Sequence, residues 1–299
     1  MEGYLHPLYA ESFSEIGTPL YLPKSKGWLI KRQIPGTNYF DAMGPYPLFF
    51  CENWDVLIED FIGLKNELVS ISLVLSPFSD FPINEYQDFF EIFKVYKDHY
   101  ILDLSLPLNK TISKNKQRNA KRALRNLDVE LKVSPNIDLD EWVILYNCLI
   151  ERHDIDGLRA FSRKSFENQI AIPNTHYFRI LHNRKVVGGN LFYIQGDVAY
   201  AHLSAFTEEG YELGAAYAVK WVALNHLKKM IRWVNFGGGV DESSEKIGGL
   251  DLFKKGWSSS SEKSYFCGKI LNKELYEQLS IQKSDNNNQW FPSYRYNDF

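Results

Sequence analysis

The residues with the clearest chemical potential lie between Trp233 and Trp257. A short apolar run that favours a strand ends in three glycines, Gly237 to Gly239. Glycine accepts positive φ and lets the backbone approach a ligand closely. After an acidic, serine-rich loop, Gly248 to Leu250 open a predicted short helix that carries Phe253, Lys254 and Lys255. A lysine held there could face a phosphate or a developing oxyanion.

Three residues near this segment could act as a general base. Asp241 and Glu242 follow the glycines, and His202 lies in a predicted strand, Val198–Ala205. A carboxylate or a neutral imidazole can take the proton of an attacking amine. The residues alone leave open which of the three, or water, has that role. A solvated loop for the two acids and a core position for the histidine are the structural alternatives.

A second candidate site is the segment from Tyr211 to Ala216, which precedes a long apolar helix predicted over Gly214–Met230. Small residues such as Gly214, Ala215 and Ala216 let successive backbone N–H groups point at a phosphate. The dipole of the helix N-terminus adds to this attraction. A helix start packed tightly on a sheet would need the same small residues.

Two further residues are candidates for substrate binding. Arg152 follows a predicted helix, Asp138–Glu151, and its guanidinium suits bidentate phosphate binding. Tyr46 lies in a Gly-Pro turn within Asp41–Phe49. A structural ion pair for Arg152 and aromatic packing for Tyr46 are the alternative interpretations.

The largest local charge imbalance lies between Lys110 and Arg125. The segment has no acidic residue and carries seven basic ones: Lys110, Lys114, Lys116, Arg118, Lys121, Arg122 and Arg125. The sequence is compatible with a helix for which Ser113 is a plausible N-cap. It is either a solvated helix that links two domains or a helix that faces an anion.

The composition of the 299 residues predicts a sheet-rich protein, because 15% of them are aromatic. The net charge of −3 argues against binding through bulk positive charge. The three cysteines have no metal-ligand spacing. We expect a soluble cytoplasmic protein without membrane insertion, since the N-terminus is unlike a signal peptide and no apolar run reaches the roughly 18 residues of a membrane span.

The predicted elements divide the chain into two domains. We expect an N-terminal domain over residues 1–110, a basic linker helix over 111–126 and a C-terminal domain over 127–283, with a tail over 284–299 that docks back. A helix is predicted over Asn84–Lys94 in the first domain. In the second domain the helices and strands are expected in the order β-α-α-β-β-β-α-β-α-β.

The succession of strand, glycines, Gly-Leu and Phe-Lys from Trp233 to Lys254 resembles the FemAB-type transferases. This resemblance implies an α/β mixed-sheet fold with two tandem GNAT-like acyltransferase domains, the N-terminal one degraded. It implies that Lys254 faces the acyl-transfer site. Tyr211 to Ala216 is similar to the GNAT pyrophosphate loop, although Tyr211 stands where glutamine or arginine is usual. Arg152 and the Tyr46 segment resemble parts of the family that face the acceptor.

The resemblance implies an N-acyltransferase. We expect an acyl-CoA thioester as co-substrate and no metal, with the amino group of a nucleotide-linked amino sugar or cell-envelope precursor as the acceptor. Catalytic roles fall to Lys254, Asp241, Glu242 and His202. The acyl-CoA would bind at Tyr211, Gly214, Ala215 and Ala216, and the acceptor at Arg152, Tyr46, Gly237, Gly238, Gly239 and Phe253.

Two alternatives stay open. One is an aminoacyl-tRNA donor, as in the FemAB enzymes that build the peptidoglycan bridge, which the basic segment would favour because RNA binding relies on neutralising phosphates. The other is a binding module that keeps the fold without catalysis.

Overall fold

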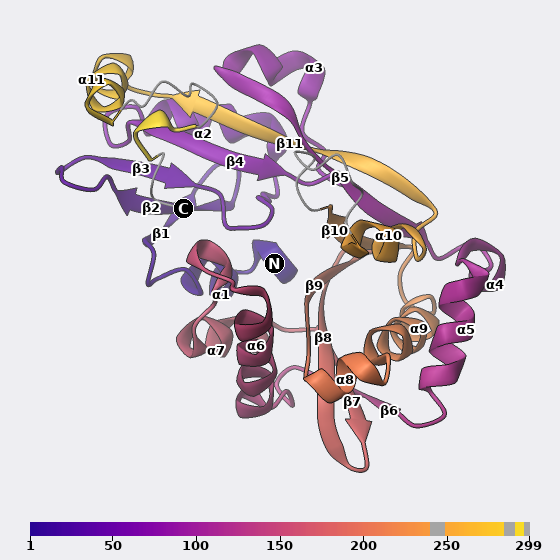
Figure 1. The fold of residues 1–299 in the computed structure, drawn as a ribbon. Coiled ribbons are helices and arrows are strands. Elements are labelled where there is room, and N and C mark those ends of the chain that lie inside the picture. The colour runs from indigo at the N-terminus through magenta and orange to yellow at the C-terminus, as the bar shows by residue number, and fades with distance from the viewer. Residues whose placement is uncertain (240–248, 284–290, 296–299) are drawn as a thin grey trace. The chain divides into compact units, whose positions relative to one another are not determined.

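The computed structural model describes residues 1–239, 249–283 and 291–295 (Figure 1). The chain divides into two compact units. Unit 1 contains Gly3–Tyr96 and the chain from Lys263 onward, and unit 2 contains Lys97–Glu262. Two long strands, β5 and β11, each run from one unit into the other.

The sheet of unit 1 has the strand order β1-β2-β3-β4-β11. β3 pairs with β4 in parallel, whereas the other neighbours are antiparallel. The strands are β1 (Thr18–Leu22), β2 (Gly27–Gln33), β3 (Phe40–Met43), β4 (Ser70–Leu75) and β11 (Ser260–Ile270). The α-helices are α1 (Pro7–Glu11), α2 (Leu57–Gly63), α3 (Ile83–Tyr86) and α11 (Lys273–Lys283).

A buried ion network lies in unit 1. The Asp41 carboxylate accepts hydrogen bonds from Arg32 Nε at 3.2 Å and from Arg295 Nε at 2.5 Å, and each of these side chains is at most 6% exposed. The neighbouring Tyr294 hydroxyl lies 2.7 Å from Ser70 Oγ. Two residues of the predicted tail are therefore part of the unit 1 core.

The sheet of unit 2 has the strand order β5-β10-β9-β8-β7-β6. β10 pairs with β9 in parallel, and the other neighbours are antiparallel. The strands are β5 (Ile92–Asp103), β6 (Asp128–Val133), β7 (Thr175–His182), β8 (Lys185–Gln195), β9 (Val198–Phe206) and β10 (Trp233–Gly238). The α-helices are α4 (Leu108–Thr111), α5 (Lys114–Ala123), α6 (Leu139–His153), α7 (Arg163–Ala171), α8 (Glu208–Glu212), α9 (Ala215–Leu227) and α10 (Gly249–Lys255).

Helices cover both faces of this second sheet. The Tyr177 ring packs on Trp142 of α6 at 5.6 Å, and the next residue, Phe178, packs on His226 of α9 at 5.7 Å. Successive side chains of a strand point to opposite faces, so α6 and α9 lie on opposite faces of the sheet. In Figure 1 the two helices flank β7 and β8 accordingly.

The described residues also form five short 3₁₀ helices, which are Gly3–Leu5, Trp54–Val56, Gln87–Phe89, Gly157–Arg159 and Ser293–Arg295. The helix predicted over Asn84–Lys94 is wrong, because α3 ends at Tyr86 and β5 starts at Ile92. Ile92, Phe93 and Val95 are aromatic or β-branched, and such residues favour extended backbone.

The boundaries of the two units differ from the predicted domain limits, which were 1–110, 111–126, 127–283 and 284–299. Residues from Lys97 belong to unit 2, where β5 pairs with β10 through Ile101 and Leu102. α5 also belongs to unit 2, since Ala120 and Ala123 lie in one apolar core with α9. Beyond Lys263 the chain returns to unit 1, because β11 pairs there with β4. No helix among the described residues is long and apolar enough to cross a membrane.

Candidate active site

The parallel strands β9 and β10 of unit 2 pair over only a short length. Trp233 to Asn235 pair with Val198 to Tyr200, and the pairing goes no further, although β9 continues to Phe206. On its other side β10 bulges against β5 between Asn235 and Gly238. The end of β10 therefore leaves the regular sheet at the glycines that the sequence singles out.

The Asn235 side chain holds this turn of the backbone. Its Oδ1 accepts a hydrogen bond from the Gly237 N–H at 2.8 Å and lies 3.1 Å from His99 Nδ1. Gly237 has a φ of 79°, which favours glycine. Burial lowers the pKa of His99 to about 4, so the ring is neutral and Nδ1–H donates to Asn235. The asparagine thus fixes the conformation of the glycine turn.

Lys254 lies at the same turn. Its Nζ donates a hydrogen bond to the Gly238 carbonyl oxygen at 2.5 Å, and a Cβ added to Gly237 would lie 3.6 Å from that nitrogen. Burial lowers the pKa of Lys254 to about 8, an effect that Asp251 partly offsets. The structure therefore brings together Lys254 and the glycines, while the neighbouring Lys255 is exposed.

Of the three candidate bases, the structure describes only His202. Asp241 and Glu242 lie outside the described residues, and their role stays a prediction. His202 is half-buried, desolvation of its ring lowers its pKa to about 3, and its Nε2 lies 2.9 Å from Gln169 Oε1. An imidazole that binds protons so weakly is a poor base near neutral pH. The geometry of His202 favours a structural role.

Arg152 and Tyr211, predicted in two different sites, contact each other. The Arg152 guanidinium lies 4.1 Å from the Tyr211 ring centroid and forms an ion pair with Glu208. Arg152 stands in the last turn of α6 and Tyr211 in α8. Its guanidinium is therefore already engaged by a carboxylate and a ring, which is the structural alternative that the sequence left open.

The helix α9 begins where the sequence predicts it. Gly214 is the N-cap with a φ of 73°, and Ala215 and Ala216 form the first turn. The Gly214 N–H already donates to the Tyr211 carbonyl oxygen at 3.1 Å. The amides of the two alanines could hold a pyrophosphate, although the carboxylates of α8, from Glu208, Glu209 and Glu212, oppose an anion there.

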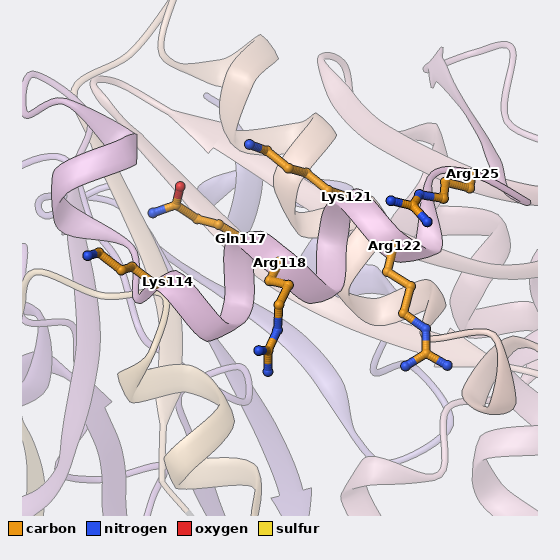
Figure 2. Close-up of a pocket in the computed structure, with 6 residues that line it drawn as sticks. All are labelled: Lys114, Gln117, Arg118, Lys121, Arg122 and Arg125. Carbon is orange, nitrogen blue, oxygen red and sulfur yellow. The ribbon is translucent and has the colours of Figure 1, made fainter.

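The basic segment forms an exposed stripe on α5 (Figure 2). A shallow cavity of about 520 Å³ is lined by one amide and five cations, Gln117, Lys114, Arg118, Lys121, Arg122 and Arg125. Ser113 caps the helix as predicted, with its side chain accepting from the Lys116 N–H. None of the five cations has an ion pair with a described residue. We call these five cations the α5 stripe.

Two functional candidates were missed by the sequence analysis. Lys220 is 8% exposed in the middle of α9, and Asn235 is 1% exposed in β10. Each is a polar residue within an apolar element, and that isolation is the signal that could have found them. Tyr46, by contrast, lies in unit 1 with its carbonyl oxygen accepting from the Tyr9 hydroxyl. Among the described residues, no group of three His, Cys, Asp or Glu could hold a metal ion.

The comparisons with known proteins identify the fold. No protein-family model and no curated protein matches the sequence. The structure of FemX is similar with a TM-score of 0.69 and 14% identity over 91% of this chain and 93% of that one. The C-terminal domain of a putative lysylphosphatidylglycerol synthetase from Agrobacterium fabrum has a TM-score of 0.64 and 14% identity, over 91% and 92%. L-PGS from Bacillus licheniformis has a TM-score of 0.60 and 13% identity, over 93% and 96%.

These similarities extend over nearly the whole chain in each case. The predicted mixed α/β fold is therefore confirmed, and FemX and L-PGS have a similar fold. Whether unit 1 is a degraded GNAT copy stays a prediction.

Proposed function

We propose that the protein is a transferase that moves an acyl group from an activated donor to the amino group of a nucleotide-linked amino sugar or cell-envelope precursor. The observation that carries this proposal is the position of the Lys254 ammonium at the glycine turn where β10 leaves β9. The fold shared with FemX and with lysylphosphatidylglycerol synthetase supports it.

The reaction needs no covalent intermediate. The amine nitrogen attacks the carbonyl carbon and forms the new C–N bond. The tetrahedral intermediate then collapses, and the bond to sulfur or oxygen breaks with its electron pair leaving on the carrier. The proton of the amine passes to a base, for which Asp241 and Glu242 remain our proposals, and then to the leaving group.

Lys254 would stabilise the oxyanion of this intermediate. Its ammonium is partly buried, and a charge in such a site interacts more strongly than in water. With a pKa of about 8 it is mostly protonated at pH 7. The hydrogen bond to the Gly238 carbonyl holds Nζ at the turn before the substrate arrives, so little reorganisation is needed during the reaction.

The first candidate donor is an acyl-CoA thioester. It is favoured by the left-handed Gly214 and by the small residues Ala215 and Ala216 at the start of α9. The second candidate is an aminoacyl-tRNA. It is favoured by the α5 stripe, whose cations have no acidic partner among the described residues.

A binding screen separates the two donors. Acetyl-CoA, longer acyl-CoAs and an aminoacyl-tRNA pool are titrated into the purified protein and into two variants. Ala216→Glu places a carboxylate at the start of α9 without changing Gly214. The double variant Lys121→Glu and Arg122→Glu reverses two charges of the α5 stripe.

Tight acyl-CoA binding that only Ala216→Glu removes would support the thioester donor. Salt-sensitive tRNA binding that only the double variant removes would support the aminoacyl-tRNA donor. A protein that binds either donor but transfers no acyl group to any amine would be the non-catalytic module instead.

A further inference from the structure

Lysine side chains from two helices of unit 2 contact the ring of Phe253, and a third lysine follows this residue in the chain. Lys116 Nζ, from α5, lies 4.5 Å from the ring centroid, and Lys220 Nζ, from α9, lies 5.8 Å from it. Lys254 follows Phe253 directly in α10, and its charge lowers the pKa of Lys220. We call these three side chains the Phe253 lysine cluster.

Lys220 is the most enclosed of the three. Its side chain is 8% exposed, and among the described residues its Nζ has neither a carboxylate partner nor a hydrogen-bond acceptor. The nitrogen lies instead 5.0 Å from the centroid of the Phe236 ring. A ring face recovers only about 0.5 to 2 kcal/mol of the cost of taking an ammonium out of water. Burial, followed by the charge of Lys254, lowers the pKa of Lys220 to about 7.

The described surroundings do not balance this charge. In the part of the chain that the structure describes, the other titratable groups near the cluster are Lys97, His99 and Tyr100 of β5, Tyr217 of α9 and Asp251 of α10. Asp251 accepts a hydrogen bond from the Tyr100 hydroxyl at 3.3 Å and raises the pKa of Lys254. That carboxylate therefore offsets the charge of Lys254 and leaves Lys116 and Lys220 without a counter-ion among the described residues.

The like charges of Lys220 and Lys254 lie close enough to repel each other in a partly desolvated site unless an anion joins them. Each ammonium carries up to three donors, and a phosphate offers several acceptor oxygens. The rings of Phe236, Phe253 and Tyr217 add apolar walls beside the ammonium groups. These features match a phosphate ester, whose charged head and less polar body need both kinds of contact.

We propose that the Phe253 lysine cluster binds one phosphate group, with Lys220 as its contact from α9. The inference rests on the proposed function only for the molecule that carries the phosphate. That molecule is either the donor, through its nucleotide carrier, or a nucleotide-linked acceptor.

Binding of phosphate is coupled to protonation of Lys220. An anion beside the amine favours its charged form, so the bound state takes up a proton above pH 7. The affinity therefore falls as the pH rises, by up to tenfold per pH unit for one coupled proton.

The test is isothermal titration calorimetry with inorganic pyrophosphate, CoA and UDP at pH 7.5. The variants are Lys220→Met, which removes the charge at similar volume, Lys220→Arg, which restores it, and Lys229→Met, a control at an exposed lysine just after α9. We expect at least tenfold weaker pyrophosphate binding by Lys220→Met, a substantial rescue by Lys220→Arg and less than a twofold change for Lys229→Met. Titration of the wild type in buffers of different ionisation enthalpy should show proton uptake.

The CoA and UDP titrations show whether the donor or the acceptor carries the phosphate. If Lys220→Met weakens CoA binding but not UDP binding, the phosphate belongs to the donor, and the reverse assigns it to the acceptor. Unchanged pyrophosphate binding by a folded Lys220→Met protein would overturn the proposal, as would the absence of binding of all three probes to the wild type. Absence of acyl transfer with every donor, together with intact binding, would defeat the proposed function and leave this site standing.

Discussion

Lys254 Nζ lies 2.5 Å from the carbonyl oxygen of Gly238, so the ammonium of α10 is fixed to the end of β10. The same turn is held from its other end by Asn235, whose Oδ1 accepts the Gly237 N–H. A cation and an amide thus position one short stretch of backbone beside the place where two parallel strands part. The proposed chemistry depends on this arrangement.

The pH dependence of transfer should report on Lys254. Burial lowers the pKa of this lysine from 10.5 to about 8, so the ammonium that stabilises the oxyanion is lost as the pH rises through 8. We expect kcat/KM to fall above that pH, and the falling limb to move to higher pH in Lys254→Arg, because arginine stays protonated. A pH–rate profile of both proteins checks this. An identical falling limb in the two would assign the ionisation to another group.

Replacing Lys220 by methionine should stabilise the protein near neutral pH. The folded state holds the pKa of Lys220 at about 7, against 10.5 when unfolded, so the unfolded chain binds more protons between these values. Wild-type stability therefore rises with pH across this window. Lys220→Met lacks the cost of holding this amine in a site that disfavours its charge. That cost is about 4 kcal/mol of unfolding free energy at pH 7 for a pKa shift of this size.

Urea denaturation at pH 7 and at pH 9.5 measures this difference. The excess stability of Lys220→Met should shrink at the higher pH. A variant that is less stable than the wild type by the same amount at both pH values would show that the lysine stem, rather than its charge, governs the site.

Asn235→Ala should weaken the glycine turn. The change leaves the Gly237 N–H and His99 Nδ1 without the acceptor that both now share. A buried donor left unsatisfied costs about 1 to 3 kcal/mol, so we expect a loss of about 2 to 4 kcal/mol in the free energy of unfolding. Asn225→Ala, in the more accessible surface of α9, should cost less than about 1 kcal/mol. Chemical denaturation of both variants provides the comparison, and equal losses would argue against a special role for Asn235.

Asp41→Ala should destabilise unit 1 strongly. The change leaves the buried guanidinium groups of Arg32 and Arg295 without their shared carboxylate. Breaking a buried ion pair by removing one partner costs about 3 to 5 kcal/mol. The exposed pair of Asp140 with Arg163 gives the matched control, since Asp140→Ala should cost under about 1 kcal/mol. A loss of similar size in both variants would contradict this account of the network.

Much of the candidate site could be predicted from local sequence signals. Glycines at the end of an apolar strand and a lysine on the next helix predicted the turn that the structure shows. Gly214 likewise marked the start of α9, because a left-handed residue at a helix boundary favours glycine. These features depend on backbone conformation over a few residues, which the sequence encodes directly.

The remainder depends on contacts between distant segments. Lys220 is enclosed because β10 and α10 place the rings of Phe236 and Phe253 beside it. The contact between Arg152 and Tyr211 joins the end of α6 to α8, and nothing in either local motif encodes it. The apolar spacing over Asn84–Lys94 fits a helix, whereas β-favouring residues from Ile92 and the place of β5 in the sheet together produce the strand.

The most direct test of the central claim is a single-turnover transfer measurement with Lys254→Met. The acyl group of whichever donor binds in the screen is followed onto an amine acceptor, with Lys255→Met as a control at the exposed neighbour. We expect Lys254→Met to lower the rate constant by about 10²- to 10³-fold at unchanged donor affinity, as for the loss of one oxyanion donor. Lys255→Met should stay within about twofold of the wild type. A wild-type rate for Lys254→Met, or equal losses in the two variants, would contradict the account.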